Sequence, residues 1–157
     1  MNHIEVDLVA TNLKIAFVVS KFNENVCDRL LEGALDSFAS HEGKKENITL
    51  LRVPGAFELP LAAKKLANSG RFDAIVCLGA VIRGETSHYD YVCANASSGI
   101  SSTSLETGIP ISFGLLTTDT YEQAIERSGT KICNQGKNAT VCAIEMARVL
   151  KQISEAQ

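Results

Sequence analysis

Short apolar runs alternate with longer amphipathic stretches along this chain of 157 residues, and that alternation limits the fold more than any other feature. Four apolar runs have the length of a buried strand, at residues 14–20, 48–53, 73–80 and 111–117. Each run is followed by apolar side chains at helical spacing. A strand and a helix repeated four times predict a parallel sheet with right-handed crossovers, covered by helices on both faces in a three-layer α/β sandwich.

Two segments near the ends of the sequence extend this pattern. The last helix is expected to bury one apolar face, made of Val141, Ile144, Val149, Leu150 and Ile153. Residues 1–12 alternate apolar and polar side chains, which predicts an edge strand that pairs with its own sheet or with a neighbouring subunit. We therefore expect an N-terminal extension over residues 1–12 and a single α/β domain over residues 13–157.

The charge of the chain bears on its partners. Its formal net charge is −3, so it lacks the basic excess that binds a nucleic-acid backbone or an anionic membrane. No apolar run approaches the ~18 residues of a membrane span, and the first residues lack the basic and apolar blocks of a secretion signal. We expect a cytoplasmic protein with neither nucleic acid nor membrane as a partner.

The five cysteines include no Cys-x-x-Cys pair, which argues against a disulfide framework and against a zinc site. We expect them to be reduced, small apolar side chains, and we expect no metal ion. A catalytic thiol at Cys93 or Cys133 is the alternative, but the sequence places no base beside either residue.

Ligands of open parallel sheets bind beyond the carboxyl ends of the strands, so the segments that follow the strands form the candidate site. Residues 79–86 have the outline of the phosphate-binding loop G-x-x-x-x-G-K-[ST], but Glu85 stands where that loop has its lysine. A monophosphate fits better than a triphosphate, because Gly84 permits close approach and the N–H groups of Glu85 and Thr86 would lie at a helix N-terminus. Ser87–Asp90 fit a capping box, which supports a helix start there. A glycine turn that only caps a helix is the alternative.

Four side chains near these strand ends each have a functional and a purely structural interpretation. His88 lies in a first helical turn, where the helix dipole favours a neutral imidazole that could transfer protons, unless it is simply solvated. Phe22 is either a side chain at the edge of the core or a platform for a planar ring. Glu58 could accept hydrogen bonds from sugar or polyol hydroxyls, or complement a helix dipole. Arg127 could clamp a phosphate, or neutralise a helix C-terminus.

Three blocks of the sequence are specific enough to compare with a known family. They read VPGAFELP at residues 53–60, LGAVIRGETSHYD at 78–90 and EQAIERSGTK at 122–131. Together they resemble the lumazine synthase family, the penultimate enzymes of riboflavin biosynthesis, and matching positions run from about residue 12 to residue 150. The resemblance implies a flavodoxin-like four-stranded sheet and a transferase that needs no cofactor.

By that resemblance, the enzyme condenses 5-amino-6-(D-ribitylamino)uracil with 3,4-dihydroxy-2-butanone 4-phosphate to 6,7-dimethyl-8-ribityllumazine, releasing phosphate and water. His88 is then the proton donor. The ribitylaminouracil is bound by Phe22, Ala56, Phe57, Glu58, Ala80, Val81, Ile82 and Phe113. The butanone phosphate is bound by Glu85, Thr86 and Arg127.

The resemblance also implies a homo-oligomer, because Phe113 completes the ring site of an adjacent subunit. The family forms pentamers, and twelve pentamers can build an icosahedral 60-mer. The short connection over residues 129–136 resembles that of shell-forming members, and association with riboflavin synthase is a further expectation. Lys21 stands where the family usually has arginine and Gln135 where many members have lysine, so affinity for the phosphate substrate is expected to be lower.

Two other classes of protein fit the same sequence. One is a flavodoxin-like module that binds a flavin or a phosphate without catalysis, and the other is a purely structural shell protein. His88 and Arg127 argue against both classes, since neither role requires the two side chains together.

Overall fold

The sheet at the centre of the molecule is parallel throughout, as the alternation predicts. The computed structural model describes residues 1–129 and 133–157. Its strands are β1 (Ile15–Ser20), β2 (Ile48–Val53), β3 (Ala74–Ile82) and β4 (Ile111–Thr118). They lie in the order β2-β1-β3-β4, and each neighbouring pair is parallel.

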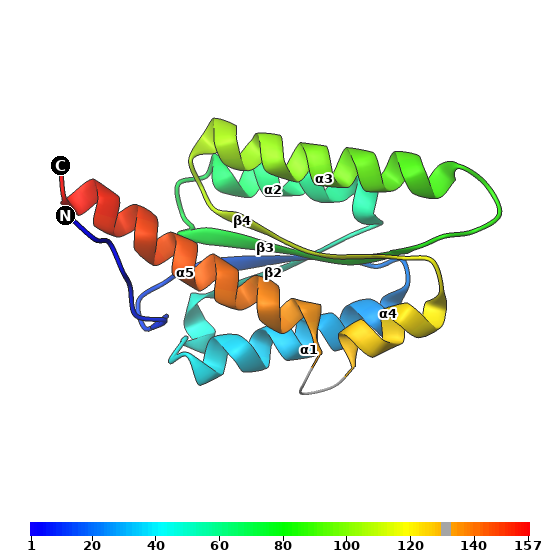
Figure 1. Ribbon diagram of the computed structural model, residues 1–157, viewed down its shortest axis with the longest axis horizontal. Helices are drawn as coiled ribbons and strands as arrows, with labels where there is room; N and C mark the ends of the chain where they lie inside the picture. Colours follow the sequence, from blue (N-terminus) through cyan, green and yellow to red (C-terminus); the bar gives the residue numbers. More distant parts are fainter. Residues whose placement is uncertain (130–132) are drawn as a thin grey trace.

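Helices cover both faces of this sheet (Figure 1). One layer holds α2 (Leu59–Ala67) and α3 (His88–Thr107), and the opposite layer holds α1 (Glu24–Ser40), α4 (Tyr121–Ser128) and α5 (Gln135–Glu155). Short 3₁₀ turns at Lys45–Asn47 and Ala56–Glu58 precede β2 and α2. The predicted three-layer sandwich with a flavodoxin-like sheet is confirmed.

Strand β1 contributes to the core on both sides of the sheet, because all of its side chains are buried. Ile15, Phe17 and Val19 pack with α1 and α5, whereas Ala16 and Val18 pack with α2 and α3. This division follows the two-residue period of a strand. Burial on both faces explains why the segment is continuously apolar rather than alternating.

The buried face of α5 differs from the predicted one, and only Ile144 belongs to both. Small residues form most of the buried face, namely Gly136, Ala139, Thr140, Ala143 and Ala147. Val149 and Leu150 are half-buried, and Ile153 is exposed. Helices α5 and α1 lie so close that a Cβ on Gly136 would overlap the Leu30 carbonyl. The close approach of the two helix backbones therefore decides which residues of α5 are buried. The hydrophobicity of the side chains alone does not reveal this buried face.

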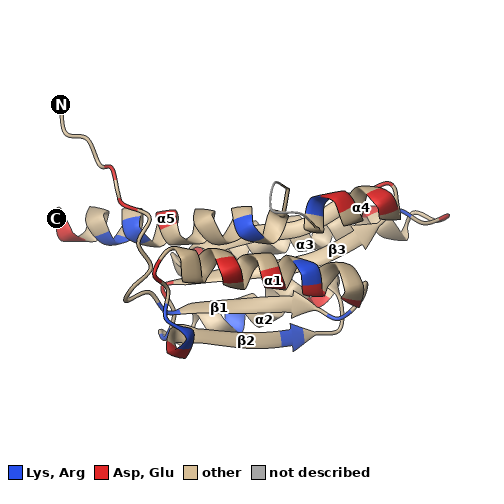
Figure 2. Ribbon diagram, turned by 90° about the horizontal axis from the view of Figure 1, so that it is seen from below, with Lys and Arg blue, Asp and Glu red and all other residues tan. Residues whose placement is uncertain are grey.

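The N-terminal segment forms no strand with this sheet, so the expectation that it pairs with its own sheet is wrong. The Ala10 N–H donates to the His41 carbonyl at 2.8 Å, which ties the end of the segment to the end of α1. From there the chain passes the C-terminal part of α5, where Glu5, Val6 and Asp7 line a pocket together with Arg148 and Lys151, and its first residues extend beyond the helices and strands (Figure 2). Ile4 and Leu8 remain 42% and 38% exposed. Pairing with a neighbouring subunit stays a prediction.

Candidate functional site

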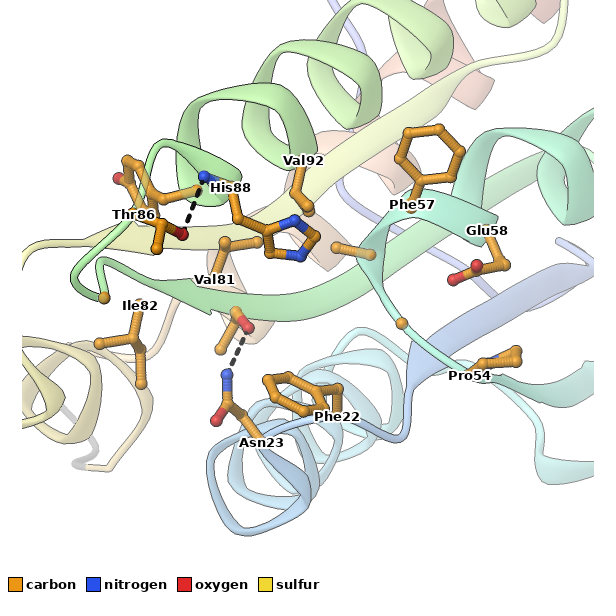
Figure 3. Close-up of a pocket in the computed structure, with 15 residues that line it drawn as sticks. Phe22, Asn23, Pro54, Phe57, Glu58, Val81, Ile82, Thr86, His88 and Val92 are labelled. Atoms are coloured by element: carbon orange, nitrogen blue, oxygen red, sulfur yellow. Dashed lines mark hydrogen bonds between the residues drawn. The ribbon is translucent and has the colours of Figure 1, made fainter.

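A cleft of about 690 Å³ opens at the carboxyl edge of the sheet, beyond the ends of β1, β2 and β3. It is lined by Phe22, Asn23, Pro54, Gly55, Ala56, Phe57, Glu58, Ala80, Val81, Ile82, Gly84, Thr86, His88, Tyr89 and Val92. The segments that follow three separate strands thus meet in one place (Figure 3). This is where parallel α/β sheets bind small molecules.

Nine of the twelve residues predicted for the site line this cleft, and Glu85, Phe113 and Arg127 do not. Sequence reasoning did not assign Asn23, Pro54, Gly55, Gly84, Tyr89 or Val92 to the site, although each lies in or beside a segment that it singled out. For Asn23, Pro54, Gly55 and Gly84, a position just after a strand end was the available signal, whereas Tyr89 and Val92 lie on α3.

Phe22 follows β1 and is 72% exposed, so it is not a core-edge side chain. Asn23 next to it has a φ of 59°, a left-handed conformation that asparagine tolerates better than most residues. Its Nδ2 donates to the Ala80 carbonyl at 2.8 Å, which joins the end of β1 to the end of β3. The Phe22 N–H donates to the Pro54 carbonyl at 3.1 Å. These bonds hold an exposed aromatic ring at one wall of the cleft (Figure 3).

The opposite wall comes from the 3₁₀ turn between β2 and α2. Phe57 is 55% exposed, and the Glu58 carboxylate points into the cleft (Figure 3). Asn95 Nδ2 on α3 donates to the Phe57 carbonyl at 3.1 Å and so fastens the turn to the helix above it. A carboxylate and an aromatic ring held in this way can bind a ligand that has both hydroxyl groups and a planar part.

The loop between β3 and α3 brings His88 into the cleft, where its imidazole lies between Val81 and Phe57 (Figure 3). The predicted capping box at Ser87 is wrong, because the Ser87 side chain makes no capping hydrogen bond. Instead the His88 N–H is 3.4 Å from Thr86 Oγ1. A capping box does occur in α4, where Thr120 and Gln123 bond reciprocally.

Three predicted residues lie apart from the cleft in the single chain. Glu85 is exposed in the β3–α3 loop beside Thr86, and Phe113 is 37% exposed on the edge strand β4. Arg127 lies on α4, on the opposite side of the sheet from α3 (Figure 1), with Nη1 3.4 Å from the Gln123 carbonyl. One subunit therefore does not bring Arg127 or Phe113 to His88.

Two positions depart from the family pattern. Lys21 is exposed directly after β1, and Gln135 is the first residue of α5. Neither side chain lines the cleft. The short connection over residues 129–136 includes residues 130–132, which are outside the described part of the chain.

Titratable groups around the first turns of α3 have shifted pKa values. Burial raises the pKa of the Cys93 thiol, and burial likewise raises that of Tyr89. Hydrogen bonding to Asp119 raises the pKa of Arg83. Cys93 is thus held as a neutral thiol, which disfavours it as a nucleophile. Cys133, the other candidate thiol, does not line the cleft.

Within residues 1–129 and 133–157, no three His, Cys, Asp or Glu side chains gather so that they could hold a metal ion. In the same residues, no helix combines the length and apolarity needed to cross a bilayer.

The sheet order, the two helical layers and the cleft at the carboxyl edge define a flavodoxin-like α/β protein with a candidate small-molecule site. The model of the 6,7-dimethyl-8-ribityllumazine synthase family matches residues 12–151. A 6,7-dimethyl-8-ribityllumazine synthase of Deinococcus deserti is 53% identical over 155 residues, which is 99% of each chain. One of Syntrophus aciditrophicus is 57% identical over 146 residues, covering 93% of this chain and 95% of the relative.

The chain therefore belongs to the 6,7-dimethyl-8-ribityllumazine synthase family. The resemblance in the three sequence blocks is confirmed. An enzyme of this type is a transferase of riboflavin synthesis.

Proposed function

We propose that this chain condenses 5-amino-6-(D-ribitylamino)uracil with 3,4-dihydroxy-2-butanone 4-phosphate to 6,7-dimethyl-8-ribityllumazine, with release of phosphate and water. The observation that carries the proposal is the convergence of Phe22, Glu58 and His88, from three separate segments, on one cleft. An aromatic platform, a hydroxyl acceptor and a proton-transfer group correspond to the ring, the ribityl chain and the condensation chemistry of these substrates.

The pyrimidine occupies the end of the cleft near Phe22, whose exposed ring stacks on it. The ribityl chain extends toward the 3₁₀ turn of Ala56, Phe57 and Glu58, where the carboxylate accepts hydrogen bonds from hydroxyl groups. Backbone groups of Ala80, Val81 and Ile82 at the end of β3 contact the edge of the ring.

The butanone phosphate occupies the end of the cleft near the β3–α3 loop. Thr86 offers its hydroxyl, and the backbone of Glu85 and Thr86 offers N–H groups near the positive end of the α3 dipole. His88 gives and takes protons during imine formation, loss of phosphate, tautomerisation and ring closure. Positioning of two substrates supplies much of the remaining rate acceleration.

Arg127 and Phe113 belong to this site as contributions of an adjacent subunit. Both are at least one third exposed in the single chain and lie away from the cleft. Placed beside a neighbour's cleft, the Arg127 guanidinium holds the phosphate and stabilises the charge that develops as it leaves. A homo-oligomer, and for this family a homopentamer, is then the catalytic unit.

Edge strand β2 supports such an assembly, because Leu50 and Leu51 on it are 47% and 37% exposed. The apolar alternation of residues 1–12 of a neighbouring chain could cover that edge. Twelve pentamers could further build an icosahedral 60-mer, with riboflavin synthase as an associated partner in the cytoplasm. Chains of 16.9 kDa give about 85 kDa for a pentamer and about 1,000 kDa for a 60-mer, so sedimentation separates the two.

The decisive experiment mixes both substrates with the purified protein. Lumazine fluorescence should rise together with one equivalent of inorganic phosphate. Tight binding of riboflavin or flavin mononucleotide without turnover would instead identify a non-catalytic flavin-binding module. A particle of shell size that neither turns over the substrates nor binds flavin would identify a structural shell protein.

A further inference from the structure

Arg83 is the first residue after β3, and its contacts lie outside the roles assigned above. Its N–H donates to the Thr118 carbonyl at 2.9 Å, which continues the β3–β4 ladder by one residue. Beyond it, residues 84–87 form the exposed loop that leads to His88. Arg83 thus stands at the point where the rigid sheet gives way to the loop that carries the cleft residues.

The guanidinium of Arg83 contacts the first turn of α3 and the loop between β4 and α4. Nε donates to Asp119 Oδ1 at 3.0 Å, and Nη1 lies 3.4 Å from Asp90 Oδ1. Its Cζ atom lies 4.3 Å from the centre of the Tyr89 ring. Tyr89 and Asp90 are the two residues that directly follow His88 in α3. One planar cation therefore binds the first turn of α3 by an ion pair and by a cation–π contact.

Asp119, which accepts the hydrogen bond from Arg83 Nε, is itself held by a further hydrogen bond. The Asp119 N–H donates to Gln123 Oε1 at 2.8 Å, the same oxygen that accepts the Thr120 N–H in the capping box that begins α4. The guanidinium consequently links the first turn of α3 to the residue that precedes the N-cap of α4, a helix on the opposite face of the sheet (Figure 1). Within the loop, by contrast, Gly84 has open space where a side chain would stand, and the Thr86 hydroxyl makes only a 3.4 Å contact with the His88 N–H.

We propose that Arg83 is a positioning residue for His88. Its guanidinium holds the first turn of α3 against the β4–α4 loop and thereby orients the His88 imidazole. This inference rests on the proposed function, in which the direction of the imidazole matters for proton transfer. Exposed ion pairs add little to global stability, so this contact acts on local order rather than on the fold. A lysine cannot replace it fully, because an ammonium lacks the planar fork that meets two carboxylates and a ring together.

The test compares Arg83→Met and Arg83→Lys with Arg71→Met. Arg71 is a matched control, since it is also exposed and also lies over a ring, that of Phe72 at 5.1 Å, but it is remote from the cleft residues. Two readouts are taken on each full-length protein: amide hydrogen exchange across residues 84–90, and kcat and KM for both substrates. Melting midpoints are measured alongside.

In Arg83→Met we expect exchange at residues 84–90 to accelerate about tenfold and kcat to fall by a similar factor. KM for the pyrimidine should stay within about twofold, because its contacts come from other segments. For Arg83→Lys, the exchange rate and kcat should lie between those of the parent and of Arg83→Met. Arg71→Met should match the parent in exchange of this loop and in kcat.

Unchanged exchange and unchanged kcat in Arg83→Met would overturn the proposal. So would faster exchange spread over the whole chain with a lowered melting midpoint, because that result describes a general structural role. If the parent protein forms no lumazine at all, the proposed function fails, and the exchange measurement alone then decides whether Arg83 orders the loop.

Discussion

Asn134 gives the sharpest stability prediction, because a single amide joins three helices. It is the N-cap of α5, where its Oδ1 accepts the Lys137 N–H at 3.1 Å. Its Nδ2 donates to the carbonyls of Arg29 in α1 at 3.1 Å and of Ser128 in α4 at 2.9 Å. The residue is only 8% exposed, so water cannot readily replace these bonds.

The cost of Asn134→Ala follows from these contacts. Loss of the N-cap destabilises by about 1 kcal/mol. Each lost bond to a buried carbonyl adds about 0.5–1.5 kcal/mol. The free energy of unfolding should therefore fall by about 2–4 kcal/mol, which for a chain of this size lowers the melting temperature by roughly 5–15 °C.

Urea unfolding followed by circular dichroism measures this change, and Asn134→Ser is the matched control. Serine retains an N-cap acceptor for the Lys137 N–H but cannot reach both carbonyls, so about 1 kcal/mol should be recovered relative to alanine. A loss below about 0.5 kcal/mol in Asn134→Ala, which is the size of an ordinary surface substitution, would refute the reasoning. Equal destabilisation by alanine and serine would show that the N-cap contributes nothing.

Three further predictions concern the site, a buried hydroxyl and a buried thiol. His88→Ala should lower kcat by roughly a hundredfold through loss of proton transfer. Arg127→Ala should impair chemistry or phosphate binding more severely. Near-native kinetics in both variants would disprove these roles. The Ser112 hydroxyl is buried with no hydrogen-bond partner among the described residues, so Ser112→Ala should leave the urea midpoint unchanged or raise it, and a clear fall would reveal a partner. Burial raises the pKa of Cys77 from 9.0 to about 12. As the pH rises, the thiol therefore loses its proton in the unfolded chain before it does so in the folded protein, and the free energy of unfolding should fall above about pH 9. Urea titrations at increasing pH should show a smaller fall in Cys77→Ala.

Much of the fold could be predicted from the sequence because strands that are buried on both faces of a sheet are continuous apolar runs. Strands β1 and β3 are continuous apolar runs, and each is followed by turn residues. Since carboxyl ends of parallel strands share one edge, Phe22, Glu58 and His88 could be placed together before any distance was known. The cleft contains all three.

The remaining features depend on distances that no spacing rule supplies. The capping box failed at Ser87 because Asp90 pairs with Arg83 from the preceding strand end. The N-terminal segment does not pair with its own sheet, because its Ala10 N–H bonds to the end of α1; its pairing with a neighbouring subunit stays a prediction. In each case a specific side-chain or backbone contact outweighed the local pattern.

The separation of Arg127 from the cleft has a genetic consequence under the proposed assembly. A His88→Ala chain still carries Arg127, and an Arg127→Ala chain still carries a complete cleft. When the two are expressed together at equal levels, random assembly of a ring pairs an intact cleft with an intact neighbouring arginine at about one quarter of the positions. Two alleles that are each strongly impaired should then complement one another, and a cell that carries both should need less added riboflavin than a cell that carries either allele alone.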